Sequence, residues 1–191
     1  MRLSIIILSN LFLATTTTHA RAISLSQLKT RAAIFGFAPH QTIATSDSTA
    51  AKDVVSSITE WETDVNTVNE FLNNPTAANL NSAIDSAQNE PVQLGILSKV
   101  TGLSAAGQSA ATLLTGNFDS VVSNLQNAQA GSISTEDATT AINFNRCCTI
   151  LPAIGILWTA AAEASDAGFT PPAPQLEDQC ASINCAAGAS A

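Results

Sequence analysis

Residues 46–75, SDSTAAKDVVSSITEWETDVNTVNEFLNNP, carry the strongest folding signal in the chain. Large apolar side chains recur there at alternating intervals of four and three residues, at Val54, Ile58, Trp61, Val65, Val68 and Leu72. These intervals place all of them on one side of an α-helix. Polar residues at 46–48 are suited to cap the start of this helix, and Pro75 ends it. The stretch therefore predicts one long amphipathic helix.

The residues that follow repeat the helical signal. We predict four further helices, over about residues 75–89, 92–102, 104–131 and 135–164. Ser134 and Asp137 have the spacing of a capping box at the start of the last one. The last two helices have apolar stripes at Gly107, Ala110, Leu114, Phe118, Val121, Leu125 and Ala128, and at Phe144, Cys147, Leu151, Ile154, Trp158 and Ala161. Pro91 ends or kinks the first of the four helices, and Gly116 with Asn117 either splits the third or only weakens it. Pro152 should kink the last one, because the proline ring removes a backbone hydrogen bond and crowds the preceding turn. Alanine, the best helix former, makes up 33 of the 191 residues. The predicted fold class is all-α, a small bundle of about five helices.

The first twenty residues have the features of a secretory signal peptide. Arg2 provides the positive start, Leu3–Ala14 is an apolar run, and Ala20 is a suitable cleavage point, with Ala22 as a second. The apolar run is too short to cross a bilayer, which needs about 20 residues. We therefore expect a secreted, extracellular protein that does not span a membrane and is either released or held in a cell wall.

Changes of composition divide the chain into four regions. Residues 1–20 are the signal peptide, 21–46 an N-terminal arm or pro-segment interrupted by Pro39, and 47–166 the helical bundle. Residues 167–191 are first rich in proline and then rich in alanine and serine, without a helical pattern. This last region is predicted to be a tail.

The charge balance narrows the range of partners. Fifteen acidic residues outweigh seven basic ones, so the net charge is −8 at pH 7. Nucleic acids and anionic membrane surfaces both attract positively charged proteins. We therefore expect no nucleic-acid partner, and we interpret the acidic side chains as a solvated surface.

Four cysteines lie in the last quarter of the chain, at Cys147, Cys148, Cys180 and Cys185. An even number in a secreted protein predicts disulfides. A bond between the adjacent pair would strain a continuous helix. Two pairings remain, Cys147–Cys180 with Cys148–Cys185, or Cys147–Cys185 with Cys148–Cys180. Either pairing staples the tail to the last helix, and each bridge would contribute about 3–4 kcal/mol by the loop-entropy model. The spacing is not a usual zinc motif, and no metal or cofactor is predicted.

Recognisable catalytic groups are scarce. His40 is the single histidine after the signal peptide, and no GxSxG motif accompanies it. Glu60, Glu62 and Asp64 surround Trp61, but we interpret them as a solvated helix surface rather than an acid–base pair. An enzyme is therefore disfavoured.

The layout of these segments resembles a known family. VVSSITEWETDVNTVNEFLNN (54–74), the Ala-, Asn- and Glu-rich second helix, and ATLLTGNFDSVVSNLQNA (111–128) are similar to the hydrophobic surface-binding protein A family of filamentous fungi, which includes the cell-wall galactomannoproteins. The resemblance covers roughly residues 48–164. It implies a small helical bundle that adsorbs to hydrophobic surfaces or holds a fatty acid between its helices, and it implies no catalytic residues.

An apolar ligand site would use the aromatic residues of the predicted helices. These candidates are Trp61, Phe71, Phe118, Phe144 and Trp158. They either line an apolar tunnel or simply fill the core. Arg146 either pairs with an acidic residue of another helix or the tail, or receives a ligand carboxylate at the mouth of a cavity.

Two functions follow as hypotheses. The first is a non-enzymatic secreted protein that binds a hydrophobic surface, a lipid or a fatty acid. The alternative is a cell-wall or effector-type interaction protein that acts on a protein partner through its surface, without a cavity.

Overall fold

The computed structural model describes residues 48–186, and these consist of helices and connecting segments without a β-strand. The predicted signal peptide (1–20) and N-terminal arm (21–46) lie outside the described residues, as do residues 187–191. The helical elements are α1 (Ser48–Asn73), α2 (Ala77–Leu97), α3 (Ala105–Thr115), α4 (Phe118–Gln129), α5 (Thr135–Asn145), the π-helical turn η1 (Arg146–Ile150), α6 (Leu151–Ala164) and the 3₁₀ turn η2 (Asp178–Ser182). The all-α bundle with a disulfide-tethered tail is confirmed.

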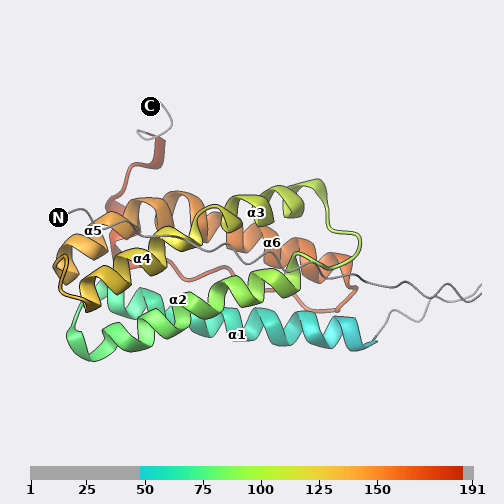
Figure 1. Ribbon diagram of the computed structural model, residues 1–191. Coiled ribbons are helices and arrows are strands. Elements are labelled where there is room, and N and C mark those ends of the chain that lie inside the picture. Colours follow the sequence, from blue (N-terminus) through green and yellow to red (C-terminus); the bar gives the residue numbers. More distant parts are fainter. Residues whose placement is uncertain (1–47, 187–191) are drawn as a thin grey trace, which may run out of the picture. The chain divides into compact units, whose positions relative to one another are not determined.

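The helices pack in pairs that are close in space (Figure 1). α1 lies along α2, α3 lies along α6, and α4 packs against α2 and α5. The large side chains of this core are shielded from water, with Trp61, Trp158, Phe71 and Ile58 among the completely buried ones. The core lies between the α1–α2 pair and the α3–α6 pair.

The apolar stripe predicted in residues 46–75 is confirmed as the buried side of α1. All six of its residues are at most 2 % exposed. The next helix begins two residues later than predicted, because Thr76 is its N-cap and Thr76 N donates to Asn79 Oδ1 at 3.1 Å. The side chain of Asn79 thus satisfies one of the donors that a helix start leaves free.

Pro91 lies inside α2 rather than at its end, so the separate helix predicted at 92–102 is wrong. A proline inside a helix costs about 3 kcal/mol. The turns on either side of Pro91 bury Ala87, Glu90, Leu94 and Leu97 against the other helices. This tertiary packing outweighs the local cost of the proline.

The predicted helix at 104–131 is split at Gly116 and Asn117, one of the two outcomes expected there. Asn117 Nδ2 donates to the Leu113 carbonyl at 2.7 Å and satisfies the end of α3. Ser134 then caps α5, as its spacing to Asp137 predicts, and accepts from Asp137 N at 3.0 Å. Local side-chain chemistry therefore sets most helix ends.

The last predicted helix is one continuous segment, Thr135–Ala164, with a π-helical turn directly before Pro152. Leu151 N donates to the Arg146 carbonyl, five residues back, so this turn is wider than an α-helical one. By length and composition the segment is apolar enough to cross a membrane, and 56 % of its most apolar window is buried inside the bundle. Such burial is typical of the central helix of a helical bundle.

Two disulfides hold the tail. They join Cys147 to Cys180 and Cys148 to Cys185, which is one of the two predicted pairings. The tail also contacts α1, where Asn69 Nδ2 donates to the Gln175 carbonyl at 2.6 Å and Asp178 N donates to Asn73 Oδ1 at 2.8 Å. The tail is therefore bound to both the first and the last helices of the bundle.

Candidate functional site

Four of the five candidate aromatic residues fill the core. Trp61, Phe71, Phe118 and Trp158 are at most 2 % exposed. The Trp61 ring lies 5.9 Å from that of Phe118 and 6.0 Å from that of Trp158, centroid to centroid. These distances are typical of packed aromatic pairs. The alternative in which the aromatic side chains fill the core is the one observed.

Phe144 is 44 % exposed, so its predicted place on the buried side of the last helix is wrong. The prediction assumed regular α-helical spacing from Phe144 to Cys147. The π turn that begins at Arg146 changes the rotation per residue, and Ile142 and Asn143 take the buried positions instead.

Arg146 is completely buried and paired with Glu90. Arg146 Nη1 donates to Glu90 Oε1 at 3.1 Å, Nε donates to Asn69 Oδ1 at 3.1 Å, and Nη2 donates to the Val65 carbonyl at 3.4 Å. Trp61 Nε1 donates to the second oxygen of Glu90 at 3.2 Å. The interpretation of Arg146 as the partner of an acidic residue on another helix is confirmed, and its guanidinium does not stand at the mouth of a cavity.

Further buried polar contacts lie beside the Arg146–Glu90 pair, along the contact between α1 and α2. Ser57 Oγ donates to Gln93 Oε1 at 2.8 Å, and Asn89 Nδ2 donates to Asp64 Oδ2 at 2.7 Å. Asp64 is only 8 % exposed, so its predicted place on a solvated surface is wrong. Burial raises the pKa of Asp64, while hydrogen bonds from Asn89 and Ser86 oppose this rise.

Burial also raises the pKa of Glu90, although the charge of Arg146 and the hydrogen bonds from Trp61 and Arg146 act in the opposite direction. Glu90 was not among the predicted site residues, yet the sequence contains a signal for it. Its position falls on the apolar side of α2, between Ala87 and Leu94. An acidic residue on an apolar helix side indicates a buried partner of opposite charge.

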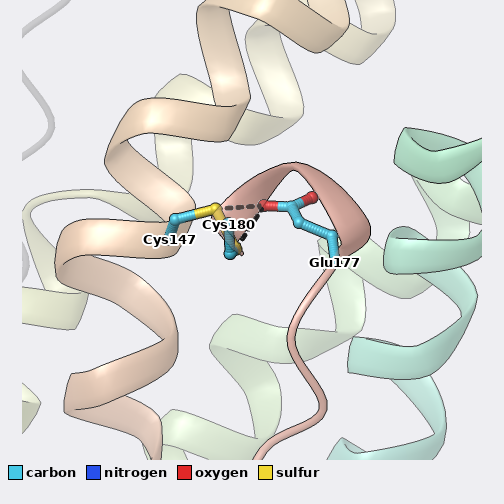
Figure 2. Close-up of side chains that lie close together, drawn as sticks. All are labelled: Cys147, Glu177 and Cys180. Atoms are coloured by element: carbon cyan, nitrogen blue, oxygen red, sulfur yellow. Dashed lines mark hydrogen bonds between the residues drawn. A yellow bond between two sulfur atoms is a disulfide. The ribbon is translucent and has the colours of Figure 1, made fainter. Parts of the chain in front are cut away.

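Glu177 brings a second carboxyl group to the same region from the tail. It is 2 % exposed, and its Oε1 lies 3.1 Å from Cys147 Sγ and 3.6 Å from Cys180 Sγ (Figure 2). Within residues 48–186, Oε2 has no hydrogen-bond partner. Burial raises the pKa of Glu177 to about 7; the charge of Arg146 opposes this and that of Glu90 adds to it.

The grouping of Cys147, Glu177 and Cys180 has three atoms of the kinds that bind metals within 4.8 Å of one another. Both sulfur atoms are joined in a disulfide, however. Thiolate, not disulfide sulfur, is the form of cysteine that binds metals. The oxidised protein therefore offers only the carboxylate at this place.

An apolar groove runs on the surface between α3 and α6. It consists of two adjoining hollows of about 420 and 410 Å³, which share Ala106, Pro152 and Ile156. Leu113 and Ile156 stand at the groove with 40 % and 47 % of their surface exposed. The residues that line it include no lysine or arginine, and Glu163 is their one charged member.

α3 and α6 approach each other closely beside this groove. A Cβ atom on Gly107 of α3 would lie 2.6 Å from Cβ of Ala160. The groove was not predicted from the sequence, although Leu113 and Ile156 are large apolar residues outside the predicted apolar stripes. Such residues indicate an exposed apolar surface.

Searches of family models, of curated proteins and of solved structures each found no match to this chain. The site is therefore interpreted from its own geometry.

Proposed function

We propose that the protein is a secreted, non-enzymatic binder of uncharged apolar molecules or surfaces, and that the groove between α3 and α6 is its binding face. The observation that carries this proposal is the exposure of Leu113 and Ile156 along a concave, mainly apolar surface. Concave apolar surfaces are the usual binding sites for small apolar ligands. The resemblance to the hydrophobic surface-binding protein A family of fungi agrees with it.

The charges around the groove favour an uncharged ligand. The basic residues within the described range are Lys52, Lys99 and Arg146, and none of them lines the groove. A fatty acid is ionised at neutral pH, and its carboxylate would find no partner there and would meet the carboxylate of Glu163. A neutral lipid, a wax or an apolar solid surface avoids this repulsion.

The surroundings of the groove support binding by a rigid surface. Cys148 lines it and is joined to Cys185 in the tail. A preformed surface loses little conformational entropy on binding. Two disulfides are also compatible with the oxidising environment of a secreted protein.

Adsorption to an alkyl-coated sensor tests the proposal. Leu113→Asp with Ile156→Asp places charges in the groove, and we expect adsorption to weaken at least about tenfold. The matched control is Val92→Asp with Ile96→Asp, since these residues of α2 are 56 % and 42 % exposed but do not line the groove. Equal losses in both double variants, or no adsorption by the wild type, would overturn the proposal.

The ligand charge is tested with a matched pair of probes. A long-chain alcohol and the corresponding fatty acid carry the same chain, and we expect the alcohol to bind more tightly at neutral pH. Tighter binding of the acid would contradict the argument from Glu163.

A second candidate function is binding to a protein partner through α2. The observation that favours it is the exposure of Val92 and Ile96, which are four residues apart and so adjacent on one side of the helix. In this case the Val92→Asp, Ile96→Asp variant would lose the function and the groove variant would keep it.

A further inference from the structure

Behind the tail, the completely or almost completely buried group of Arg146, Glu90 and Glu177 has one more carboxyl group than it has cations. Arg146 supplies one positive charge, while Glu90 and Glu177 supply two carboxyl groups, and all three side chains are at most 2 % exposed. With both carboxyl groups ionised, the cluster would hold an uncompensated negative charge away from water. Such a charge is costly, and a buried group normally takes up a proton instead.

Burial raises the pKa of Glu90 as well as that of Glu177, but the hydrogen bonds favour Glu177 as the group that carries the proton. Glu90 accepts from Arg146 Nη1 and from Trp61 Nε1, both of which favour its ionised form. Glu177 accepts from no N–H group in the described structure, and its Oε2 has no partner. Oε1 contacts the disulfide sulfur of Cys147 at 3.1 Å and that of Cys180 at 3.6 Å.

A disulfide sulfur has no hydrogen to donate. The contact in Figure 2 is therefore a hydrogen bond only when the Glu177 carboxyl group is protonated and donates its O–H to the sulfur. Ionised Glu177 would instead place a negative oxygen against a sulfur lone pair. The contact at Glu177 therefore favours the neutral acid.

Glu177 lies between the two hydrogen bonds that fix the tail to α1. Asn69 donates to the Gln175 carbonyl on one side of it, and Asp178 N donates to Asn73 on the other. Cys180 N then donates to the Glu177 carbonyl at 3.0 Å and begins η2. A change at the Glu177 side chain therefore acts directly on residues 175–180.

We propose that Glu177 is a proton-operated latch, which holds residues 175–180 against α1 and the π turn while its side chain is neutral and loosens them when it is ionised. The disulfides to Cys180 and Cys185 keep the loosened segment attached, so that opening is local and reversible. The latch is separate from the groove between α3 and α6, and its test does not depend on the proposed function.

The direction of the pH dependence follows from the proton balance. The closed latch holds its proton up to a pKa of about 7, whereas an exposed Glu177 returns to its ordinary value of 4.5. The equilibrium constant for opening therefore rises about tenfold per pH unit between these values, roughly 300-fold in all, and is constant above them.

The other charged groups around the latch lie on four elements, η1, α2, α1 and η2. Arg146 of η1 and Glu90 of α2 act on Glu177 directly. Asp64 of α1 acts on Glu90, and Asp178 follows Glu177 in the tail but is exposed. Asp178 carries the carboxyl group next to Glu177 in sequence. Asp178→Asn is therefore the matched control for Glu177→Gln.

Hydrogen exchange at the Cys180 amide, corrected for the intrinsic pH dependence of exchange, measures the opening. In the wild type and in Asp178→Asn we expect protection to fall from about pH 5 to pH 7 and then to level off. In Glu177→Gln, which keeps a neutral side chain, protection should stay high throughout. Identical pH profiles in the wild type and Glu177→Gln would overturn the proposal.

A carbon-13 NMR titration of the carboxyl groups in the intact wild type gives an independent measurement that needs no stable variant. The signal assigned to Glu177 should titrate with a midpoint near pH 7. If the Glu177 signal titrates with an ordinary midpoint, near pH 4.5, the latch does not exist.

Discussion

Arg146 Nη1 lies 3.1 Å from Glu90 Oε1, and the two side chains are 0 % and 1 % exposed. The pair joins the π turn to the middle of α2, where Pro91 interrupts the helical hydrogen bonds. Asn69, Val65 and Trp61 of α1 complete the hydrogen bonds of the two groups. The ion pair therefore connects three parts of the chain that are far apart in sequence.

Removing the cation should destabilise the protein strongly. Arg146→Met leaves Glu90 buried without its ionic partner, and we expect the free energy of unfolding to fall by about 3–5 kcal/mol. Adding Glu90→Gln to it should recover part of this loss, since no charge is then left unpaired. Denaturant unfolding of the single and double variants measures both effects, and additive losses would contradict the pairing.

The two buried tryptophans should differ in their tolerance of phenylalanine. Trp61 Nε1 donates to Glu90, whereas Trp158 Nε1 has no acceptor among the residues that the structure describes. Trp61→Phe should therefore cost about 1–3 kcal/mol more than Trp158→Phe, because both lose similar volume and only the first loses a hydrogen bond. Equal losses in denaturant unfolding would show that the bond to Glu90 adds no stability.

Adding one methyl group at Gly107 should disturb the packing of α3 against α6 and destabilise the protein. Gly107→Ala places its Cβ 2.6 Å from Cβ of Ala160, and we expect a loss of about 1–3 kcal/mol in unfolding free energy. Gly95→Ala is the control, because Gly95 lies inside α2 with nothing within 4 Å of the added Cβ. That change should stabilise the protein by about 0.5–1 kcal/mol. Stabilisation by both substitutions would contradict the close contact.

Stability should fall as the pH rises through the range in which Glu177 loses its proton. The pKa of Glu177 is about 7 in the folded protein against 4.5 as its ordinary value, so the folded state holds more protons between these values. Its contribution is complete below about pH 4.5 and lost by about pH 7, and amounts to about 3 kcal/mol. Denaturant unfolding at both ends of this range, with the disulfides intact, should show a larger loss in the wild type than in Glu177→Gln. A loss of the same size in both would assign the pH dependence to other groups, such as Asp64 and Glu90.

The part of the fold that follows from local spacing was predictable. The stripe from Val54 to Leu72, the cap at Ser134 and the break near Gly116 all depend on residues within a few positions of one another. The two permitted disulfide pairings were predictable for the same reason.

The errors share a physical cause. The sequence predicts that Pro91 breaks a helix and that Phe144 faces inward, and both predictions use only local geometry. In the folded protein, packing of the α2 side chains against α1 outweighs the proline, and the π turn shifts the face on which Phe144 lies. The buried positions of Glu90 and Glu177 depend on Arg146, which is 56 residues from Glu90 in sequence.

By itself, the sequence determined that the chain is helical, where most of its helices begin and end, and which cysteines form bonds. Those properties depend on the spacing of side chains along one helix and on the chemistry of its ends. Only the tertiary structure decided which disulfide alternative forms, which carboxyl groups are buried with Arg146, and where an apolar groove stays open. Each of these depends on which distant surfaces meet, and the spacing of residues within one segment carries no information about its partner.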